Sequence, residues 1–198
     1  DDFSVVAPDD FDAEQQNLID RAPIIQQQTI TMGITWKHNL KNGNGKVNTT
    51  LSTNRLSNIF SRYEDNENKT GVLFRNDSKE QETKLRVNVT QYLSDWKLSY
   101  GLNLQQSVYT NETQDLISNY RYDTAIDFAK YGFFGKLSRS FSNGRLSLAF
   151  GIRSDADSFT NGSNIADNLS PRLSASYALD SSSRWKLNGS VGRYFKIP

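Results

Sequence analysis

The sequence has 198 residues and a mass of 22.5 kDa, the size of a single domain or of one part of a larger protein. Its 23 basic and 22 acidic residues leave a net charge of +1, which excludes the strongly basic surface typical of nucleic-acid-binding domains. The absence of cysteine excludes disulfide scaffolds, thiolate metal sites and cysteine nucleophiles. No apolar run approaches 18 residues, so no transmembrane helix is expected, whereas a transmembrane β-barrel, whose strands alternate in polarity, is not excluded.

Residues 1–28 differ from the rest of the chain because they are acidic and are interrupted by Pro8 and Pro23. We expect this segment to be an irregular arm or extracellular loop. It has no basic start, no apolar stretch and no small-residue cleavage site, so it is not expected to be a signal peptide.

From residue 29 onward, apolar and polar residues alternate, which is the pattern of β-strands. In the clearest segment, 96–109, six of the seven even-numbered positions are apolar, against one of the seven odd-numbered positions. The adjacent Phe133 and Phe134 leave the phase of their segment open, and a bulge is one alternative. Eight strands are expected, at about 29–40, 46–57, 79–93, 96–109, 122–141, 145–154, 169–179 and 185–196.

The connections between these strands alternate in length. The short ones carry turn residues and cover 41–45, 94–95, 142–144 and 180–183, with Asn143-Gly144 as the clearest hairpin signal. The long ones are polar and cover 58–78, 110–121 and 155–168. Outer-membrane barrels have short periplasmic turns and long extracellular loops, so this asymmetry predicts the orientation of the chain as well as its fold.

Four motifs in the second half of the chain resemble barrel strands of the TonB-dependent receptors. They are YGFFGKLS (131–138), LSLAFGIRSD (146–155), NLSPRLSASYAL (168–179) and WKLNGSVGRYFKIP (185–198). The resemblance covers most of 29–198 and is closest to the subgroup that carries a carboxypeptidase-regulatory-like N-terminal domain. It implies an all-β fold, an antiparallel up-and-down transmembrane β-barrel wall that supplies about eight of about 22 strands.

The resemblance also implies a function and a set of partners. The family imports scarce nutrients such as iron chelates, oligosaccharides or peptides across the outer membrane of Gram-negative bacteria, without a cofactor and without enzymatic activity. Its partners are the lipid bilayer, a plug domain of the same protein, an inner-membrane energy-coupling protein and the nutrient, and nucleic acid is not among them. The residues do not identify the substrate, and two alternatives remain open. One is a small non-transporting outer-membrane barrel that acts as an adhesin or structural anchor, and the other is a soluble β-sandwich binding module.

The sequence departs from the family pattern in ways that predict a middle portion of a longer receptor. Neither a plug nor a coupling segment is recognisable, and the chain stops at Ile197-Pro198 instead of at a terminal aromatic residue. The polar strand faces also carry many cations without matching carboxylates, which a narrow closed barrel of eight strands would bury unpaired at high cost. The cations expected to face the lumen and to contact plug or substrate are Lys84, Arg86, Lys97, Arg153, Arg172 and Lys186.

The sequence also leads to expectations about an aromatic girdle, about metal binding and about catalysis. Aromatic residues beside the short turns are expected to form an interfacial girdle, namely Tyr92, Trp96, Phe141, Tyr177 and Trp185. No metal site is predicted, since the acidic residues Asp65, Glu67, Asp155 and Asp157 lack the spacing of an EF-hand and are only weak calcium candidates. No catalytic pair is predicted, because a serine triad would require His38, which the alternation places on the apolar face.

Overall fold

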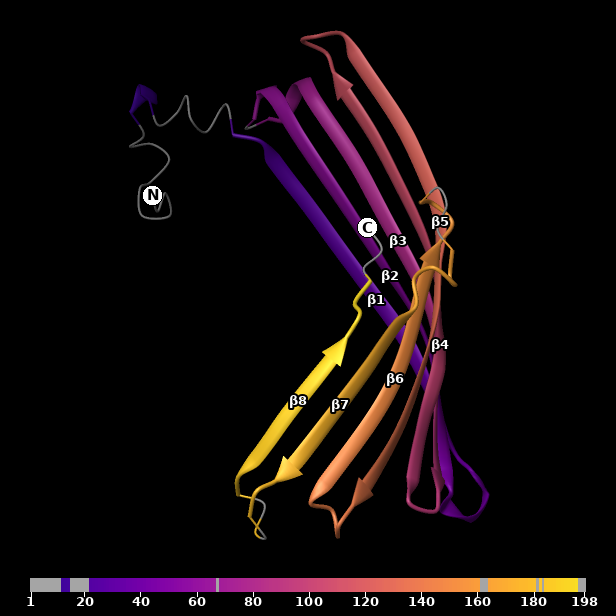
Figure 1. Ribbon diagram of the computed structural model, residues 1–198. Helices are drawn as coiled ribbons and strands as arrows, with labels where there is room; N and C mark the ends of the chain where they lie inside the picture. The colour runs from indigo at the N-terminus through magenta and orange to yellow at the C-terminus, as the bar shows by residue number, and fades with distance from the viewer. Residues whose placement is uncertain are drawn as a thin grey trace. The chain divides into compact units, whose positions relative to one another are not determined.

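The structure is a computed structural model that describes residues 12–14, 22–66, 68–160, 164–180, 182 and 184–195. These residues form one eight-stranded sheet whose strands follow each other in chain order (Figure 1). The strands are β1 (Ile24–Asn39), β2 (Gly45–Asp65), β3 (Thr70–Leu93), β4 (Trp96–Asp115), β5 (Tyr120–Phe141), β6 (Leu146–Asp157), β7 (Ser170–Ala178) and β8 (Lys186–Gly192). The prediction of an all-β, antiparallel, up-and-down sheet is therefore confirmed. No helix in the described part of the chain has both the length and the apolar character needed to cross a membrane.

The hairpins β2–β3 and β4–β5 are longer than the sequence pattern predicted. Residues 66–69 and 116–119 alone separate their strands, so most of the predicted loops 58–78 and 110–121 are in fact strand. Apolar residues in these extensions stand next to each other, as in Ile59-Phe60 and Val72-Leu73-Phe74, or are absent, as in 110–115, and for that reason the alternation disappears while the backbone pairing continues. The loop prediction was wrong at these two places because hydrophobic alternation reports the burial of one face and not the hydrogen bonding of the backbone.

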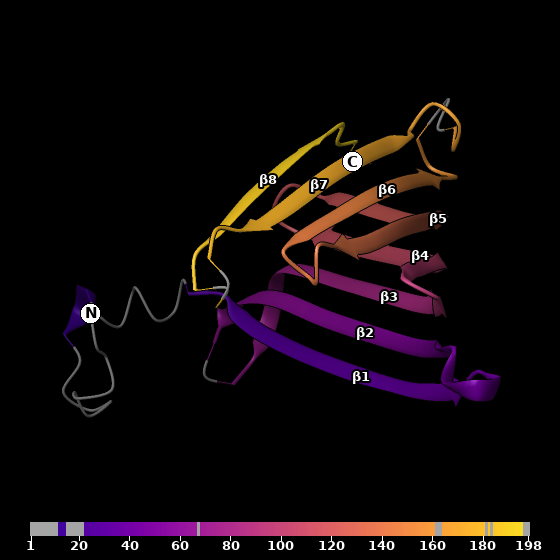
Figure 2. The same cartoon turned by 60° about the horizontal axis from the view of Figure 1, so that its bottom comes forward.

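The chain divides into two compact units. The first contains 1–30, 54–81 and 108–126, and therefore the extensions of the two long hairpins. The second contains 31–53, 82–107 and 127–198, and within it the neighbouring strands β6, β7 and β8 run side by side (Figure 2). Strand β1 begins at Ile24, inside the segment expected to be an irregular arm.

The register of the second unit resolves the strand whose phase the sequence left open. Strands β5 and β6 pair without interruption from Lys130–Asp157 to Phe141–Leu146, so β5 has no bulge along this stretch. Phe133 and Phe134 consequently point to opposite faces of the sheet. The predicted hairpin after β5 is confirmed with a shift of one residue. Ser142 and Asn143 both have positive φ, the signature of a type I′ turn, and the Gly144 N–H closes the turn by donating to the Phe141 carbonyl.

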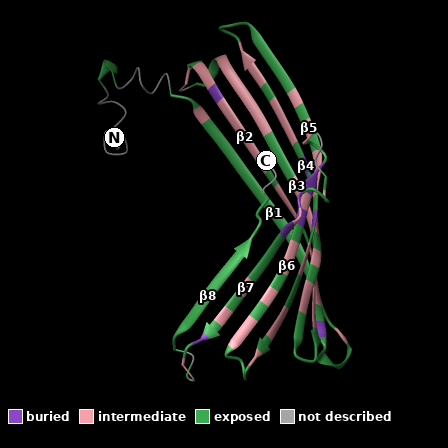
Figure 3. Cartoon of the chain, in the orientation of Figure 1, coloured by how far each residue is buried: buried purple, intermediate pink, exposed green. Residues whose placement is uncertain are grey.

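The sheet buries almost no apolar side chain in the described part of the chain, where the buried hydrophobic residues are Ala156 and Ala178. The large apolar residues are instead exposed. Exposed and half-buried stretches alternate along inner strands such as β4 and β6, whereas β1 and β8 are exposed almost throughout (Figure 3). A β-sandwich hides its apolar faces between two sheets, and the described strands form one sheet. A small closed barrel is not formed either, because β1 and β8 each have one neighbour among the described strands.

Candidate functional site

The structure sorts the side chains of the sheet into a polar face and an apolar face. On the polar face, the Arg86 Nε donates a hydrogen bond to the Asn103 Oδ1 at 3.0 Å, and the Gln105 amide donates to the Glu82 carboxylate at 2.8 Å. On the opposite face of the same strand, Leu102 and Leu104 are 40% and 46% exposed. Side chains on adjacent strands interact only when they share a face, so these contacts place the odd-numbered residues of β4 with Arg86.

The polar face of the second unit contains a hollow of about 690 Å³ that gathers three of the six predicted lumen cations. These are Arg86 from β3, Arg153 from β6 and Arg172 from β7. A fourth cation, Lys130, also lines the hollow, against a single carboxylate, Asp155. The lining is therefore strongly cationic and suits an anionic group.

The cations of the hollow differ in how they are held. Arg153 is neutralised by Asp155 through two hydrogen bonds, Nε to Oδ2 at 2.6 Å and Nη2 to Oδ1 at 3.0 Å. Arg86 is oriented only by the neutral Asn103 amide, and the Arg172 guanidinium lies over the Tyr194 ring at 4.5 Å from its centroid. Neither Arg86 nor Arg172 has a carboxylate within ion-pair distance in the described part of the chain. The positive charges of these two guanidinium groups are therefore not neutralised by a neighbouring carboxylate and can attract an anionic ligand.

Two glycines of the polar face leave room for the side chains that line the hollow. Gly192 pairs with Arg172, and a Cβ on Gly192 would lie 2.9 Å from the Arg172 Cγ. A Cβ on Gly101 would lie 2.7 Å from Cε1 of Phe134, a second lining residue. The absence of these Cβ atoms lets both side chains lie close to the sheet. Sequence reasoning missed this role, although an isolated glycine within a strand is a recognised signal of a close approach.

The other three predicted lumen cations lie outside the hollow. Lys84 forms an ion pair with Glu82, and the Lys97 ammonium lies 6.0 Å from the centroid of the Tyr92 ring. Lys186, the first residue of β8, pairs with Ala178. None of the three is brought into the same group as Arg86 and Arg172.

The residues expected to form the aromatic girdle lie at the short-turn ends of the strands, but not all on one face. Trp96, Phe141 and Tyr177 belong to the apolar alternation, and Trp185 directly precedes β8. Tyr92 differs because its ring contacts Lys97, a member of the odd-numbered, polar set of β4. The lipid-facing girdle therefore remains a prediction for the other four residues, and Tyr92 lies where a lumen-facing residue would.

The carboxylates considered as calcium ligands are occupied by N–H donors. Asp155 holds Arg153, and Asp65 accepts hydrogen bonds from the backbone and side chain of Asn68. Burial by itself would raise the pKa of Asp157, but N–H groups of Thr160 and Phe159 donate to its carboxylate and keep that pKa below its ordinary value. Glu67 lies outside the described residues. Within those residues, no three His, Cys, Asp or Glu side chains come close enough to hold a metal ion.

Comparison with known proteins agrees with this two-faced sheet. Residues 2–198 match the model of a family described as TonB dependent receptor-like, beta-barrel. The chain therefore belongs to the TonB-dependent receptor-like β-barrel family, a family of outer-membrane proteins of Gram-negative bacteria.

A solved structure described as the copper transporter OprC matches 90% of this chain at a TM-score of 0.66 and 18% sequence identity, which shows a shared fold. The chain spans 33% of that structure's length. No curated protein matches the sequence.

Proposed function

We propose that this chain forms part of the wall of an outer-membrane transporter of the TonB-dependent type, which imports a scarce nutrient such as an iron chelate, an oligosaccharide or a peptide. The observation that carries the proposal is the inverted polarity of the sheet. Large apolar side chains such as Phe150 and Val191 are 52% and 70% exposed, whereas the opposite face is polar and cationic. A lipid bilayer on one side and a water-filled lumen on the other satisfy both faces.

The length of the strands supports a membrane location. Strand β4 has 20 residues, which extend about 65 Å at roughly 3.3 Å each. Tilted by about 40°, the strand rises about 50 Å along the membrane normal, twice the apolar band of about 25 Å. The length of β4 beyond the apolar band corresponds to the residues after Val108, which are mostly polar and can extend into water.

The orientation and the organisation of the receptor are parts of the same proposal. The hairpin ends at 66–69 and 116–119, where the strands continue beyond the apolar band, face the outside, and the turns 94–95 and 142–145 at the opposite ends of the strands face the periplasm. The strands from Ile24 onward supply barrel wall, and residues 1–23 form an extracellular arm. The whole receptor carries a carboxypeptidase-regulatory-like domain and a plug, and an inner-membrane protein supplies the energy for import.

The hollow on the polar face is the proposed place of contact with plug or substrate. Its two unneutralised guanidinium groups, on Arg86 and Arg172, attract a carboxylate or another anionic group. The remaining cations of the polar face, Lys84, Lys97 and Lys186, are proposed as lumen residues with weaker roles.

Import in living cells tests this function. The whole receptor is expressed in a strain that lacks it, and growth is measured on limiting iron chelate, oligosaccharide or peptide, with and without the energy-coupling protein. We expect one of these nutrients to support growth only when both proteins are present. The double variant Arg86→Gln and Arg172→Gln should reduce uptake while the receptor remains in the outer-membrane fraction. The matched control, Lys136→Gln, removes a cation of β5 outside the hollow and should leave uptake intact. A receptor absent from the outer-membrane fraction would contradict the proposal.

A further inference from the structure

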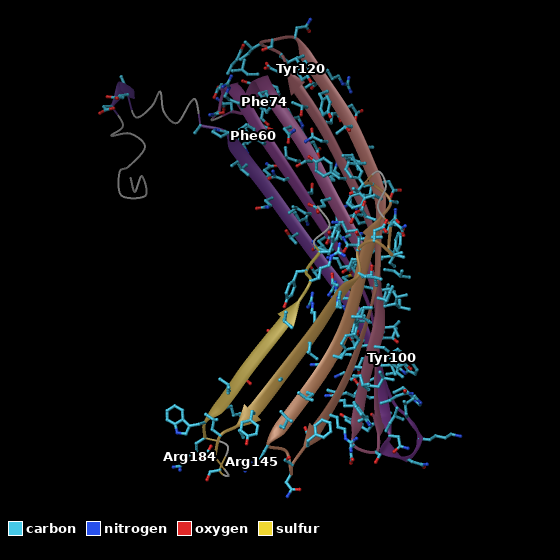
Figure 4. All side chains as sticks on the ribbon, viewed as in Figure 1. Phe60, Phe74, Tyr100, Tyr120, Arg145 and Arg184 are labelled. Carbon is cyan, nitrogen blue, oxygen red and sulfur yellow. The ribbon has the colours of Figure 1, made fainter. Side chains whose placement is uncertain are left out.

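The apolar face at the short-turn ends of β4–β7 carries arginine side chains that lie over aromatic rings. The Arg139 guanidinium carbon lies 5.2 Å from the centroid of the Trp96 ring and 5.0 Å from that of the Phe141 ring. On the next pair of strands, the Arg145 guanidinium carbon lies 5.7 Å from the centroid of the Tyr177 ring. Arg145 lies at the end of the strands where the short turns are (Figure 4).

The register places Arg139 on the face that also carries the exposed apolar residues. Arg139 pairs with Leu148 and Phe141 pairs with Leu146, which in turn pairs with Tyr177. Directly paired residues point to the same side of a sheet. Arg139 is therefore on the same face as the exposed Leu148, and Lys136, three residues before it on the same strand, is on the opposite face.

These arginines have hydrogen-bond donors left over. A guanidinium group has five N–H donors, and the Asp95 carboxylate accepts from one nitrogen of Arg139 at 2.8 Å. The Nε of Arg139 is buried and has no acceptor among the described residues, so a ligand outside the wall can reach only the Nη groups of this side chain, which is 33% exposed. Arg145 makes one long hydrogen bond of 3.5 Å to the Leu179 carbonyl, and no carboxylate lies within ion-pair distance of it in the described part of the chain. Two guanidinium groups and one carboxylate leave this rim with an excess positive charge.

The neighbouring aromatic rings indicate where the missing acceptors come from. Aromatic side chains of membrane proteins settle at the level of the lipid head groups, and the phosphate is the group at that depth with several acceptor oxygens and a negative charge. A guanidinium suits this partner because it stacks on a ring with one face and donates two parallel hydrogen bonds to phosphate from its edge.

We propose that Arg139 and Arg145, with the rings of Trp96, Phe141 and Tyr177, form a binding site on the outer surface of the wall for the phosphate of a membrane phospholipid. This inference rests on the proposed function, since it requires the apolar face to lie in the bilayer. The lipid belongs to the leaflet that meets the short turns, and an anionic phospholipid, whose head group adds no ammonium charge, is bound best. The site fixes the depth of this rim in the membrane through specific contacts, beyond the general preference of aromatic rings for the interface.

The whole receptor, purified in detergent, is titrated with phosphatidylglycerol and analysed by native mass spectrometry. Two further titrations use diacylglycerol with the same acyl chains, which lacks the phosphate, and inorganic phosphate, which lacks the chains. We expect phosphatidylglycerol to bind at least tenfold more tightly than diacylglycerol, because a hydrogen bond to a charged group is among the stronger ones. Inorganic phosphate at the same concentration should not displace the bound phospholipid.

Substitutions assign this binding to the rim. The double variant Arg139→Gln and Arg145→Gln should lose most of the preference for phosphatidylglycerol over diacylglycerol, and Lys136→Gln, on the opposite face of β5, should keep it. Each variant is first checked for heat-modifiable migration. If the double variant does not fold, Arg145→Gln alone, in an exposed position beside the turn, should weaken the phospholipid severalfold.

An unchanged preference in the folded arginine variants, or equal affinity for diacylglycerol, would overturn the inference, and displacement by inorganic phosphate would reassign the site to a free anion. The proposed function is tested separately by the presence of the receptor in the outer-membrane fraction. A receptor that reaches this fraction without selecting phosphatidylglycerol would refute the lipid site alone.

Discussion

The substitution Leu102→Arg tests which face of the sheet contacts lipid. Leu102 is 40% exposed on the apolar face and lies halfway between Trp96 and Val108, about 20 Å along the strand from each at roughly 3.3 Å per residue. With a tilt of about 40°, this puts it about 15 Å from either edge of the apolar set, close to the bilayer midplane. An arginine on the lipid face of a barrel costs about 2–4 kcal/mol at that depth, so Leu102→Arg should lower the free energy of unfolding by this amount.

The matched control is Gln105→Arg, three residues further along the same strand but on the polar face. The Gln105 amide already donates to the Glu82 carboxylate, so an arginine there meets an acceptor of opposite charge. We expect the control to change the free energy of unfolding by less than about 1 kcal/mol. Asn103 is unsuitable as a control, because it holds Arg86 through its side-chain oxygen and an arginine at that position would face a like charge.

The assay is urea unfolding of the whole receptor refolded in lipid vesicles, followed by the loss of heat-modifiable migration. The difference between the two variants is the informative quantity, since it cancels any general effect of an added charge. Equal destabilisation by Leu102→Arg and Gln105→Arg would mean that both faces are packed in a protein interior. That result would refute the membrane reasoning and favour the β-sandwich.

Three further predictions concern orientation, backbone packing and pH. Cysteine at Asn66 in the whole receptor should react with a membrane-impermeant thiol reagent on intact cells, whereas cysteine at Asn143 should not, and the reverse labelling would invert the topology. Gly101→Ala should destabilise the folded receptor by about 1–3 kcal/mol, because its Cβ would collide with a backbone carbonyl and an aromatic ring, whereas Gly189→Ala, with open space around it, should be neutral in urea unfolding. Hydrogen bonds from Ser118 lower the pKa of Asp115, so this carboxylate stabilises the 116–119 turn above its ordinary pKa near 3.9 and loses that effect as the pH falls through the lower pKa of the folded state. The protection factors of the amides in that turn, which correct for the intrinsic slowing of exchange in acid, should fall as the pH is lowered, and this fall should be absent in Asp115→Asn.

The sequence predicted the strands best where one face is apolar. The alternation at 96–109 led to the correct start of β4 at Trp96, and the strands of the second half were located to within a few residues. The prediction failed at 58–78, where the structure continues β2 and β3 as a hairpin. A segment without alternation gives no signal that separates a paired strand from a loop, because backbone hydrogen bonds do not depend on side-chain polarity.

The candidate site was predicted in part. Alternation alone placed Arg86, Arg153 and Arg172 on polar strand faces. It does not show which residues of neighbouring strands are paired with each other. Register supplied that information, because it aligned Arg153 with Phe134 and Arg172 with Gly192. The ion pair between Arg153 and Asp155, the single carboxylate of the hollow, also depends on side-chain rotamers, which the sequence does not specify.

Two polar residues that interrupt the apolar face, Gln106 and Arg139, are informative because each has a partner on that face. Gln106, the one polar residue among the even-numbered positions of 96–109, donates a hydrogen bond to Asp127 of the neighbouring strand. At the other end of the face, Arg139 lies over the Trp96 ring. An unpaired polar group costs several kcal/mol in hydrocarbon, so residues of this kind are tolerated only when paired and near an interface. Ten residues separate Trp96 from Gln106, about 33 Å along the strand and about 25 Å along the membrane normal at a tilt of about 40°. Gln106 and Arg139 therefore lie at the two edges of the hydrocarbon layer, and the apolar residues between these two levels contact lipid.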